Sequence, residues 1–203
     1  MSDSSLKRCP TCGTALKLVN GRWMCPVHDV FKTIYKSEWP KHAQNVNSLI
    51  EEIKKRFPQV SLRTGLGAES DERIDIPPAK KNEPDIEVWL TRRHLISIEV
   101  TGSDKVLVPP GDIWILAKKL TVGKESIIQG IDYLFYLVYP NNSFTLTVDI
   151  VNEYRRSVGP GGRLPGEKYI KIPAGRALPR EEVFNYIRAK ISPLYPQLRM
   201  GVM

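Results

Sequence analysis

The sequence predicts an α/β protein in which a mixed sheet is flanked by helices, with a small module ahead of it. Apolar residues recur at the spacing of one helical face from Val46 to Phe57, and β-type segments alternate with further helical ones downstream. All three cysteines stand near the start of the chain. We therefore expect three parts: a small module in residues 1–35, a linker in 36–45 and the main domain in 46–203.

Composition is that of a soluble globular protein. The chain has 203 residues, of which 41% are hydrophobic and 26% are charged. Its first residues lack the apolar core of a signal peptide, and the longest apolar-aromatic run, Tyr133 to Tyr139, is too short to cross a bilayer. We expect an intracellular, cytoplasmic protein without membrane contact, in which thiols stay reduced.

The first module carries two pairs of metal-ligand residues. Cys9 and Cys12 form one pair, and Cys25 and His28 form the other, each with two residues between them. Three thiolates and one imidazole are a tetrahedral zinc set, so we expect a Cys₃His zinc ribbon with a structural Zn²⁺. A disulfide with one spare thiol is the alternative.

The main domain begins with the helix at 46–57, which Pro58 ends, and a strand at 60–64. Residues 86–90 and 95–100 read as a strand hairpin. The remaining elements are two short helices, two strands and a last helix. We place them at residues 112–120, 124–131, 133–139, 144–151 and, after a loop at 155–166, from Pro179 onward.

Two acidic residues mark the hairpin. Asp85 follows Pro84 at the start of its first strand, and Glu99 stands between Ile98 and Val100 near the end of the second. Adjacent strands bring two such carboxylates to one place, where they can share a hard divalent cation. An unpaired carboxylate at position 99 would carry a large desolvation cost, so it needs a cation beside it.

Pro84-Asp85 followed by Glu99 resembles the PD-(D/E)xK nuclease superfamily. The resemblance implies a restriction-endonuclease-like core in which Asp85 and Glu99 hold Mg²⁺ or Mn²⁺ for phosphodiester hydrolysis. Gln129 and Tyr133, four residues apart, are similar to the Gln-x-x-x-Tyr element of its RecB and Cas4 branch, which implies contact with nucleic acid.

One position departs from the superfamily pattern. Its lysine would stand two residues after the glutamate, where this chain has Thr101. Lys105 from the turn, or Lys118 or Lys119 from the next helix, could supply the ammonium, and we favour Lys118 because a rigid helix positions it better. An inactive site is the other alternative. The superfamily also places a glutamate on its first helix, for which Glu52 is the better candidate of the pair Glu51 and Glu52.

Charge is uneven along the chain. The net charge of +8 divides into +4 for residues 1–48, −2 for 49–150 and +6 for 151–203. Basic ends attract a polyanion, whereas an acidic centre suits a divalent cation. The candidate nucleic-acid contacts are arginines in the ribbon, in the hairpin turn and in the glycine-rich loop, although a solvated surface loop is the alternative for the last group. They are Arg22, Arg92, Arg93, Arg155, Arg156 and Arg163.

Together these features predict a metal-dependent nuclease that acts on DNA, in which the ribbon aids the binding of nucleic acid or of a partner. The alternative is a nuclease-fold protein that binds DNA without cutting it, in replication, transcription or assembly. A third is a protein-interaction factor that docks through the ribbon. Many members of the resembled superfamily act as dimers, so a second copy of the chain is a further candidate partner.

Overall fold

The computed structural model describes residues 7–10, 12–19, 22–25, 38–66, 68–69, 83–103, 106–107, 111–160 and 167–194. His28, Lys105 and Arg163 lie outside these residues, and so does the side chain of Arg22. The roles expected for these four residues stay predictions.

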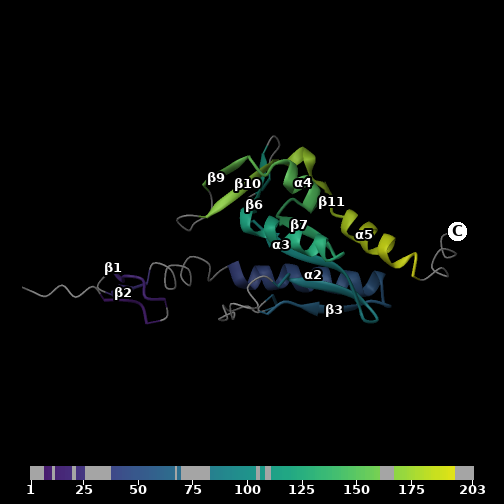
Figure 1. The fold of residues 1–203 in the computed structure, drawn as a ribbon, viewed down its shortest axis with the longest axis horizontal. Coiled ribbons are helices and arrows are strands. Elements are labelled where there is room, and N and C mark those ends of the chain that lie inside the picture. Colours follow the sequence, from purple (N-terminus) through teal and green to yellow (C-terminus); the bar gives the residue numbers. More distant parts are fainter. Residues whose placement is uncertain are drawn as a thin grey trace, which may run out of the picture.

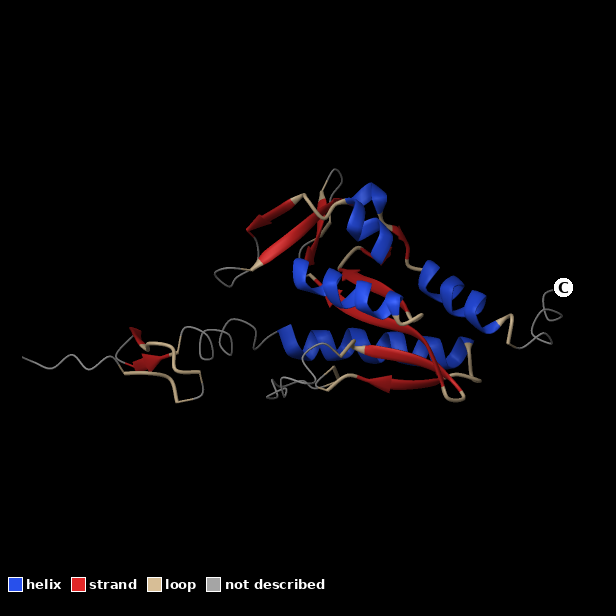
Figure 2. Cartoon of the chain, in the orientation of Figure 1, coloured by secondary structure: helices blue, strands red, loops and turns tan. Residues whose placement is uncertain are grey.

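A six-stranded mixed sheet forms the centre of the main domain (Figures 1 and 2). β5 and β7 run parallel, and every other neighbouring pair is antiparallel. The strands, in their order across the sheet, are β11 (Leu178–Pro179), β8 (Asn142–Thr147), β7 (Asp132–Tyr139), β5 (Arg93–Gly102), β4 (Ile86–Leu90) and β3 (Ser61–Thr64).

Helices cover both faces of this sheet. α2 (Glu38–Arg56) and α5 (Glu182–Ile191) share one apolar core with β4, β5 and β7. α3 (Ala117–Ile128) and α4 (Val148–Glu153) share the other core with β7 and β8. The expected α/β layout, a mixed central sheet flanked by helices, is confirmed.

α2 begins earlier than its apolar stripe predicted. Its first residue is Glu38, so most of the linker expected at 36–45 is helical. Pro40 does not interrupt it, because a proline in the first turn lacks only an N–H that has no intrahelical partner there. Ala43 is already buried one turn before Val46, which ties this end of the helix to the core.

Residues 112–120 do not form the expected helix. Their first part is β6 (Asp112–Leu116), in which Ile113 and Ile115 are buried while Asp112 and Trp114 are exposed. This alternation has the period of a strand, not of a helix. β6 pairs with β10 (Lys168–Pro173), which pairs with β9 (Val158–Pro160), in a small antiparallel sheet that the sequence pattern did not predict.

Three further boundaries differ from the expected ones. Residues 117–128 form one helix, α3, in place of the two helices expected at 112–120 and 124–131. The strand expected at 144–151 ends at Thr147, whose hydroxyl accepts a hydrogen bond from the Ile150 N–H and caps α4. The last helix, α5, begins at Glu182 and not at Pro179, which belongs to β11, and a 3₁₀ turn (Ala174–Arg176) leads from β10 into that strand.

The small N-terminal module contains a two-stranded antiparallel sheet. β1 (Lys17–Val19) pairs with β2 (Arg22–Met24), and a single bridge joins Arg8 to Ala15. Gly13 turns the chain with a φ of 70°, a left-handed conformation that favours glycine. Among all the described helices of the chain, none is long and apolar enough to cross a membrane.

Candidate active site

Register brings Asp85 and Glu99 to the same end of the hairpin. Ile86 pairs with Ile98, so the residue before β4 lies level with Glu99 on β5. The Asp85 carboxylate accepts a hydrogen bond of 2.7 Å from the backbone N–H of Val100. Its negative charge contributes to the raised pKa of Glu99, so the two carboxyl groups interact. The structure thus brings together the two residues expected to share a cation.

Glu99 is a buried carboxylate with two side-chain partners. Lys119 Nζ lies 2.5 Å from its Oε1, and the hydroxyl of Tyr133 donates to its Oε2 at 3.1 Å. The side chain faces the core that contains α3, where only 9% of the residue is exposed. Burial, reinforced by the charge of Asp85, raises the pKa of Glu99 from 4.5 to about 7 despite the neighbouring ammonium.

The lysine at the site is Lys119, not the favoured Lys118. Lys118 is exposed, whereas Lys119 is turned toward the sheet. Successive residues of a helix differ by about 100° in direction, so only one of the two can face Glu99. α3 lies close to β7 because it has Gly123 one turn later, where a Cβ would come within 3.1 Å of the Tyr133 ring.

His42, which we had not chosen as a site residue, completes the cluster. Its Nε2 lies 3.2 Å from Asp85 Oδ1. Burial lowers the pKa of His42, but the hydrogen bond to Asp85 and the charges of Asp85 and Glu99 outweigh that effect and raise it overall. The sequence did contain a sign that His42 faces inward. It stands four residues before Val46 and so continues the apolar stripe of α2 by one turn.

A cavity of about 480 Å³ adjoins the cluster. His42 belongs to both, while Asp85 and Glu99 do not line the cavity. Thr101, in the slot of the superfamily's lysine, also lines it. The complete lining comes from α2, the end of β5 and the end of β7: Lys41, His42, Gln44, Asn45, Thr101, Gly102, Ser103, Val138, Tyr139 and Pro140.

Several expected site residues lie elsewhere or face another way. Glu52 forms ion pairs with Arg56 and Arg180 at the C-terminal end of α2, so it does not join the carboxylates. Arg92 and Arg93 are exposed at the turn of the hairpin, the opposite end from Asp85 and Glu99.

The Gln-x-x-x-Tyr spacing does not fall on one helix. Gln129 is exposed just after α3, while Tyr133 is buried on β7. Tyr133 is therefore unable to touch nucleic acid, and its contact is with Glu99 instead. Burial raises the pKa of Tyr133, and the nearby carboxylates add to this, so its hydroxyl remains a donor. Arg155 and Arg156 are exposed after α4, as a contact with nucleic acid requires.

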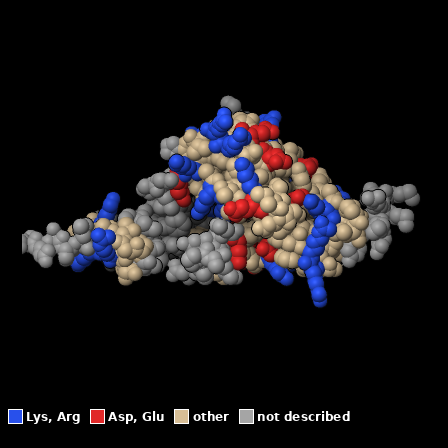
Figure 3. Space-filling model, in the orientation of Figure 1, with Lys and Arg blue, Asp and Glu red and all other residues tan. Residues whose placement is uncertain are grey.

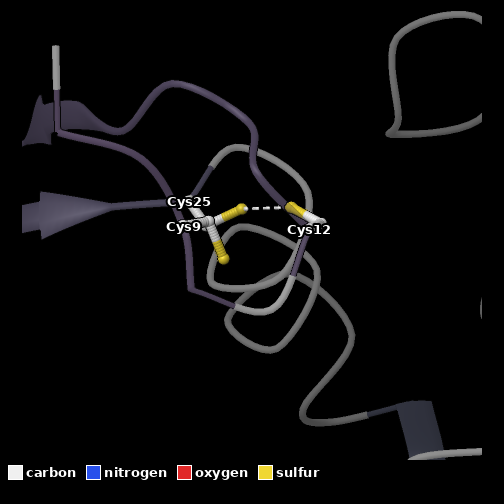
Figure 4. Close-up of side chains that lie close together, drawn as sticks. All are labelled: Cys9, Cys12 and Cys25. Carbon is white, nitrogen blue, oxygen red and sulfur yellow. Dashed lines mark hydrogen bonds between the residues drawn. The ribbon is translucent and has the colours of Figure 1, made fainter.

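The three cysteines of the N-terminal module converge (Figure 4). The Sγ atoms of Cys9, Cys12 and Cys25 all lie within 4.8 Å of one another, and those of Cys12 and Cys25 are 3.6 Å apart. Cys9, Cys12 and Cys25 form no disulfide with one another, against the disulfide alternative. A tetrahedral zinc with bonds of about 2.3 Å holds its sulfurs roughly 3.8 Å apart, so the cluster has the dimensions of a zinc site.

Among the solved structures similar to this chain are a Holliday junction resolvase and a nuclease from a virus. One is Hjc, a Holliday junction resolvase of Archaeoglobus fulgidus, with 14% identity and a TM-score of 0.43 over 69% of this chain and 97% of the resolvase. The other is D212, a nuclease from a fusselovirus, with 11% identity and a TM-score of 0.49 over 85% of this chain and 99% of the nuclease. No family model and no curated protein matches the sequence.

The raised pKa of Glu99 predicts how stability changes with pH in the metal-free protein. A carboxyl group that titrates near 7 when folded and near 4.5 when unfolded binds more protons in the folded state between those values. The free energy of unfolding should therefore fall as pH rises through this window, by at most about 3 kcal/mol. Urea unfolding at about pH 5 and about pH 8 measures the difference.

Glu99→Gln is the matched variant, because the amide keeps the shape of the carboxylate and does not titrate. It should remove most of the decrease in stability between the two pH values. The raised pKa of His42 acts in the same direction, since its stabilising contribution is lost as pH rises through its folded pKa, so a smaller slope remains. An unchanged slope in the variant would mean that Glu99 does not titrate in this window.

Proposed function

We propose that the protein is a divalent-metal-dependent nuclease that hydrolyses phosphodiester bonds of DNA. The observation that supports this best is the buried Glu99, which contacts an ammonium and interacts with a second carboxylate. A purely structural ion pair needs only one acid and one base. The additional carboxylate, the additional imidazole and the adjoining cavity are what metal-assisted hydrolysis requires.

The donor atoms fit the metal that such chemistry uses. Carboxylate oxygens are preferred by Mg²⁺ and Mn²⁺. Asp85 and Glu99 would hold the ion, and His42 would orient Asp85 through the hydrogen bond between them. When bound, the cation lowers the pKa of water and offsets the negative charge that develops on the scissile phosphate.

Three side chains of the chain support this chemistry. Lys119 places a positive charge beside Glu99, where it can orient the attacking water and stabilise the pentavalent phosphate. Tyr133 donates to Glu99 and so fixes the direction of that carboxylate. Lys41, in the wall of the cavity, is placed to meet a phosphate of the bound strand.

The competing hypothesis is a nuclease fold that binds DNA but cannot cut it. Thr101 was its main support, because the superfamily's lysine is absent from that slot. Lys119 supplies an ammonium at Glu99 from α3, so the missing lysine no longer argues against catalysis. We therefore favour the active enzyme.

A cleavage assay tests the proposal. Plasmid, linear duplex and single-stranded DNA are incubated with the purified protein and Mg²⁺ or Mn²⁺, and the products are separated on denaturing gels. We expect cleavage that depends on the added metal. Salt-sensitive binding without cleavage in either metal would instead support the DNA-binding alternative.

For the N-terminal module we propose a structural zinc ribbon that helps to hold nucleic acid or a protein partner. Cys9, Cys12 and Cys25 would supply three ligands, and His28 remains the expected fourth. Trp23 is 46% exposed with Lys7 Nζ 5.1 Å from its ring centroid, so it is not the core of the ribbon and is available for contact.

Metal analysis of the purified protein checks the zinc site. We expect about one zinc per chain, and Cys25→Ser should release most of it, because a thiolate ligand is lost. The DNA cleavage of a zinc-free preparation with added Mg²⁺ then shows whether the ribbon aids binding. A preparation with no zinc, and no uptake of added zinc, would contradict this assignment.

A further inference from the structure

The small sheet of β6, β10 and β9 has one apolar face and one exposed face. Ile113, Ile115, Ile170 and Ile172 are buried against the core that contains α3 and β7. Because side chains alternate along a strand, their neighbours point the opposite way, away from the core. Trp114 of β6 and Tyr169 and Lys171 of β10 form this second face, which we call the stacking face.

The stacking face combines aromatic rings with a cation. Trp114 pairs directly with Lys171 across the strands, and Lys171 Nζ lies 4.8 Å from its ring centroid. The Tyr169 ring centroid is 6.1 Å from that of Trp114. Trp114 is 41% exposed, although burying an indole stabilises a fold more than burying almost any other side chain. Such exposure has a cost that a ligand would offset.

Positive charge surrounds this face. The backbone N–H of Lys171 donates to the Ser157 carbonyl at 2.9 Å, which brings the turn bearing Arg155 and Arg156 beside β10. Acidic groups are also present: Glu167 accepts a hydrogen bond from the Tyr169 hydroxyl, and Asp112 lies at the start of β6. Lysines and arginines, with acidic side chains among them, lie above the centre of Figure 3, where Figure 1 places β6, β9 and β10.

We propose that the stacking face binds single-stranded nucleic acid, with a base stacked on Trp114 and the adjacent phosphates held by Lys171 and the Arg155–Arg156 turn. The choice of ligand rests on the proposed function, but the binding does not depend on the metal site. A stacked base would take the place of the ammonium over the indole, and the flexible stem of Lys171 would let its charge meet a phosphate.

Single-stranded nucleic acid fits this face better than a duplex or a second copy of this chain. In a duplex the faces of the bases are covered by their neighbours in the stack, so an exposed indole offers a duplex little. A second copy of this chain would place Lys171 and the two arginines against their own equivalents if it used a two-fold interface, and like charges oppose such contact. Unpaired bases with a phosphate backbone complement both the rings and the cations.

The stacking face is also close to the proposed active site along the chain. Trp114 precedes Lys119 by five residues, so their Cα atoms lie within about 18 Å of each other even for a fully extended chain. A strand held at Trp114 would thus be positioned a short way from the carboxylates. The face would select substrates with an unpaired segment beside the cleavage position.

A binding assay under conditions in which the DNA should not be cut tests the inference. The full-length Asp85→Asn protein, without added magnesium, is titrated into fluorescein-labelled oligothymidylate of roughly 12 nucleotides, within the range of one compact binding site. In this Asp85→Asn background, the second substitution Trp114→Ala should weaken binding about tenfold, as expected for one lost stacking contact. Trp114→Phe should restore most of it. Lys171→Ala should weaken binding. It should also reduce the slope of log binding constant against log salt concentration by about one unit, because one phosphate contact is lost.

Controls separate this inference from its alternatives. Ile128→Ala removes an apolar side chain that is 86% exposed at the far end of α3 and should leave binding unchanged. Equal binding by the Trp114→Ala protein, or an equal loss for a blunt duplex, would overturn the inference. So would sedimentation showing that Trp114→Ala turns a dimer into a monomer. If the wild-type protein cleaves nothing but binds the oligonucleotide through Trp114, only the proposed nuclease activity fails.

Discussion

Asp85→Asn is expected to reduce metal-dependent DNA cleavage by at least about a thousandfold. Asparagine keeps an oxygen that can accept the hydrogen bond from the Val100 N–H, so the end of the hairpin retains its support. What it removes is the negative charge that a divalent cation needs. Loss of metal-centred stabilisation worth several kcal/mol corresponds to three or more orders of magnitude in rate.

Glu87→Gln provides the matched control for that measurement. Glu87 stands two residues after Asp85 on β4, and its carboxylate accepts a hydrogen bond from Trp89 Nε1, which an amide oxygen can also accept. Initial rates of plasmid nicking with saturating Mg²⁺ should therefore stay near wild type in this variant. If Asp85→Asn and wild type cleaved equally, the activity would come from another site or from a contaminant.

Local sequence patterns predicted most strands of the main sheet and the helices α2 and α5 that cover one of its faces, because each of these elements has an apolar surface of its own. β4 was predicted at its observed residues, and the stripe from Val46 to Phe57 lies in the core. The small sheet was missed for a physical reason. β9 and β10 are short and partly exposed, and β6 becomes a strand by pairing with β10, more than fifty residues away in sequence.

The site was predictable only in part, for a similar reason. The register of the hairpin fixes the positions of Asp85 and Glu99. Their spacing in the sequence was therefore enough to predict that they lie close together. Which of Lys118 and Lys119 faces Glu99 depends on the rotation of α3, and this is set by packing against β7 through Gly123. His42 lies 43 residues before Asp85, and the contact between them arises from the docking of α2 on the sheet.

Tyr133 shows how a motif can mislead when its structural context is unknown. The Gln-x-x-x-Tyr spacing suggested two residues on one helix, both facing nucleic acid. In the structure a turn separates them, and Tyr133 enters the sheet as a buried donor to Glu99. The spacing therefore marked a residue near the carboxylates but predicted the wrong contact.

Lys119→Met is expected to lower the cleavage rate about a hundredfold, whereas Lys118→Met should leave it within about twofold of wild type. Methionine keeps an apolar stem of similar length, so α3 should retain its packing. Without the ammonium, the pKa of Glu99 should rise further, because the neighbouring positive charge lowers it in the wild type. Metal binding at neutral pH should weaken accordingly.

A metal titration separates these two consequences for Lys119. If the lysine only keeps Glu99 ionised, saturating Mg²⁺ or a higher pH should restore the rate of Lys119→Met to that of wild type. If it also orients water and stabilises the phosphate, kcat should stay low at every metal concentration. We expect the second result, because Lys119 Nζ directly contacts Glu99, which is one of the two proposed metal ligands. Full activity of Lys119→Met at low Mg²⁺ would show that another residue supplies the positive charge.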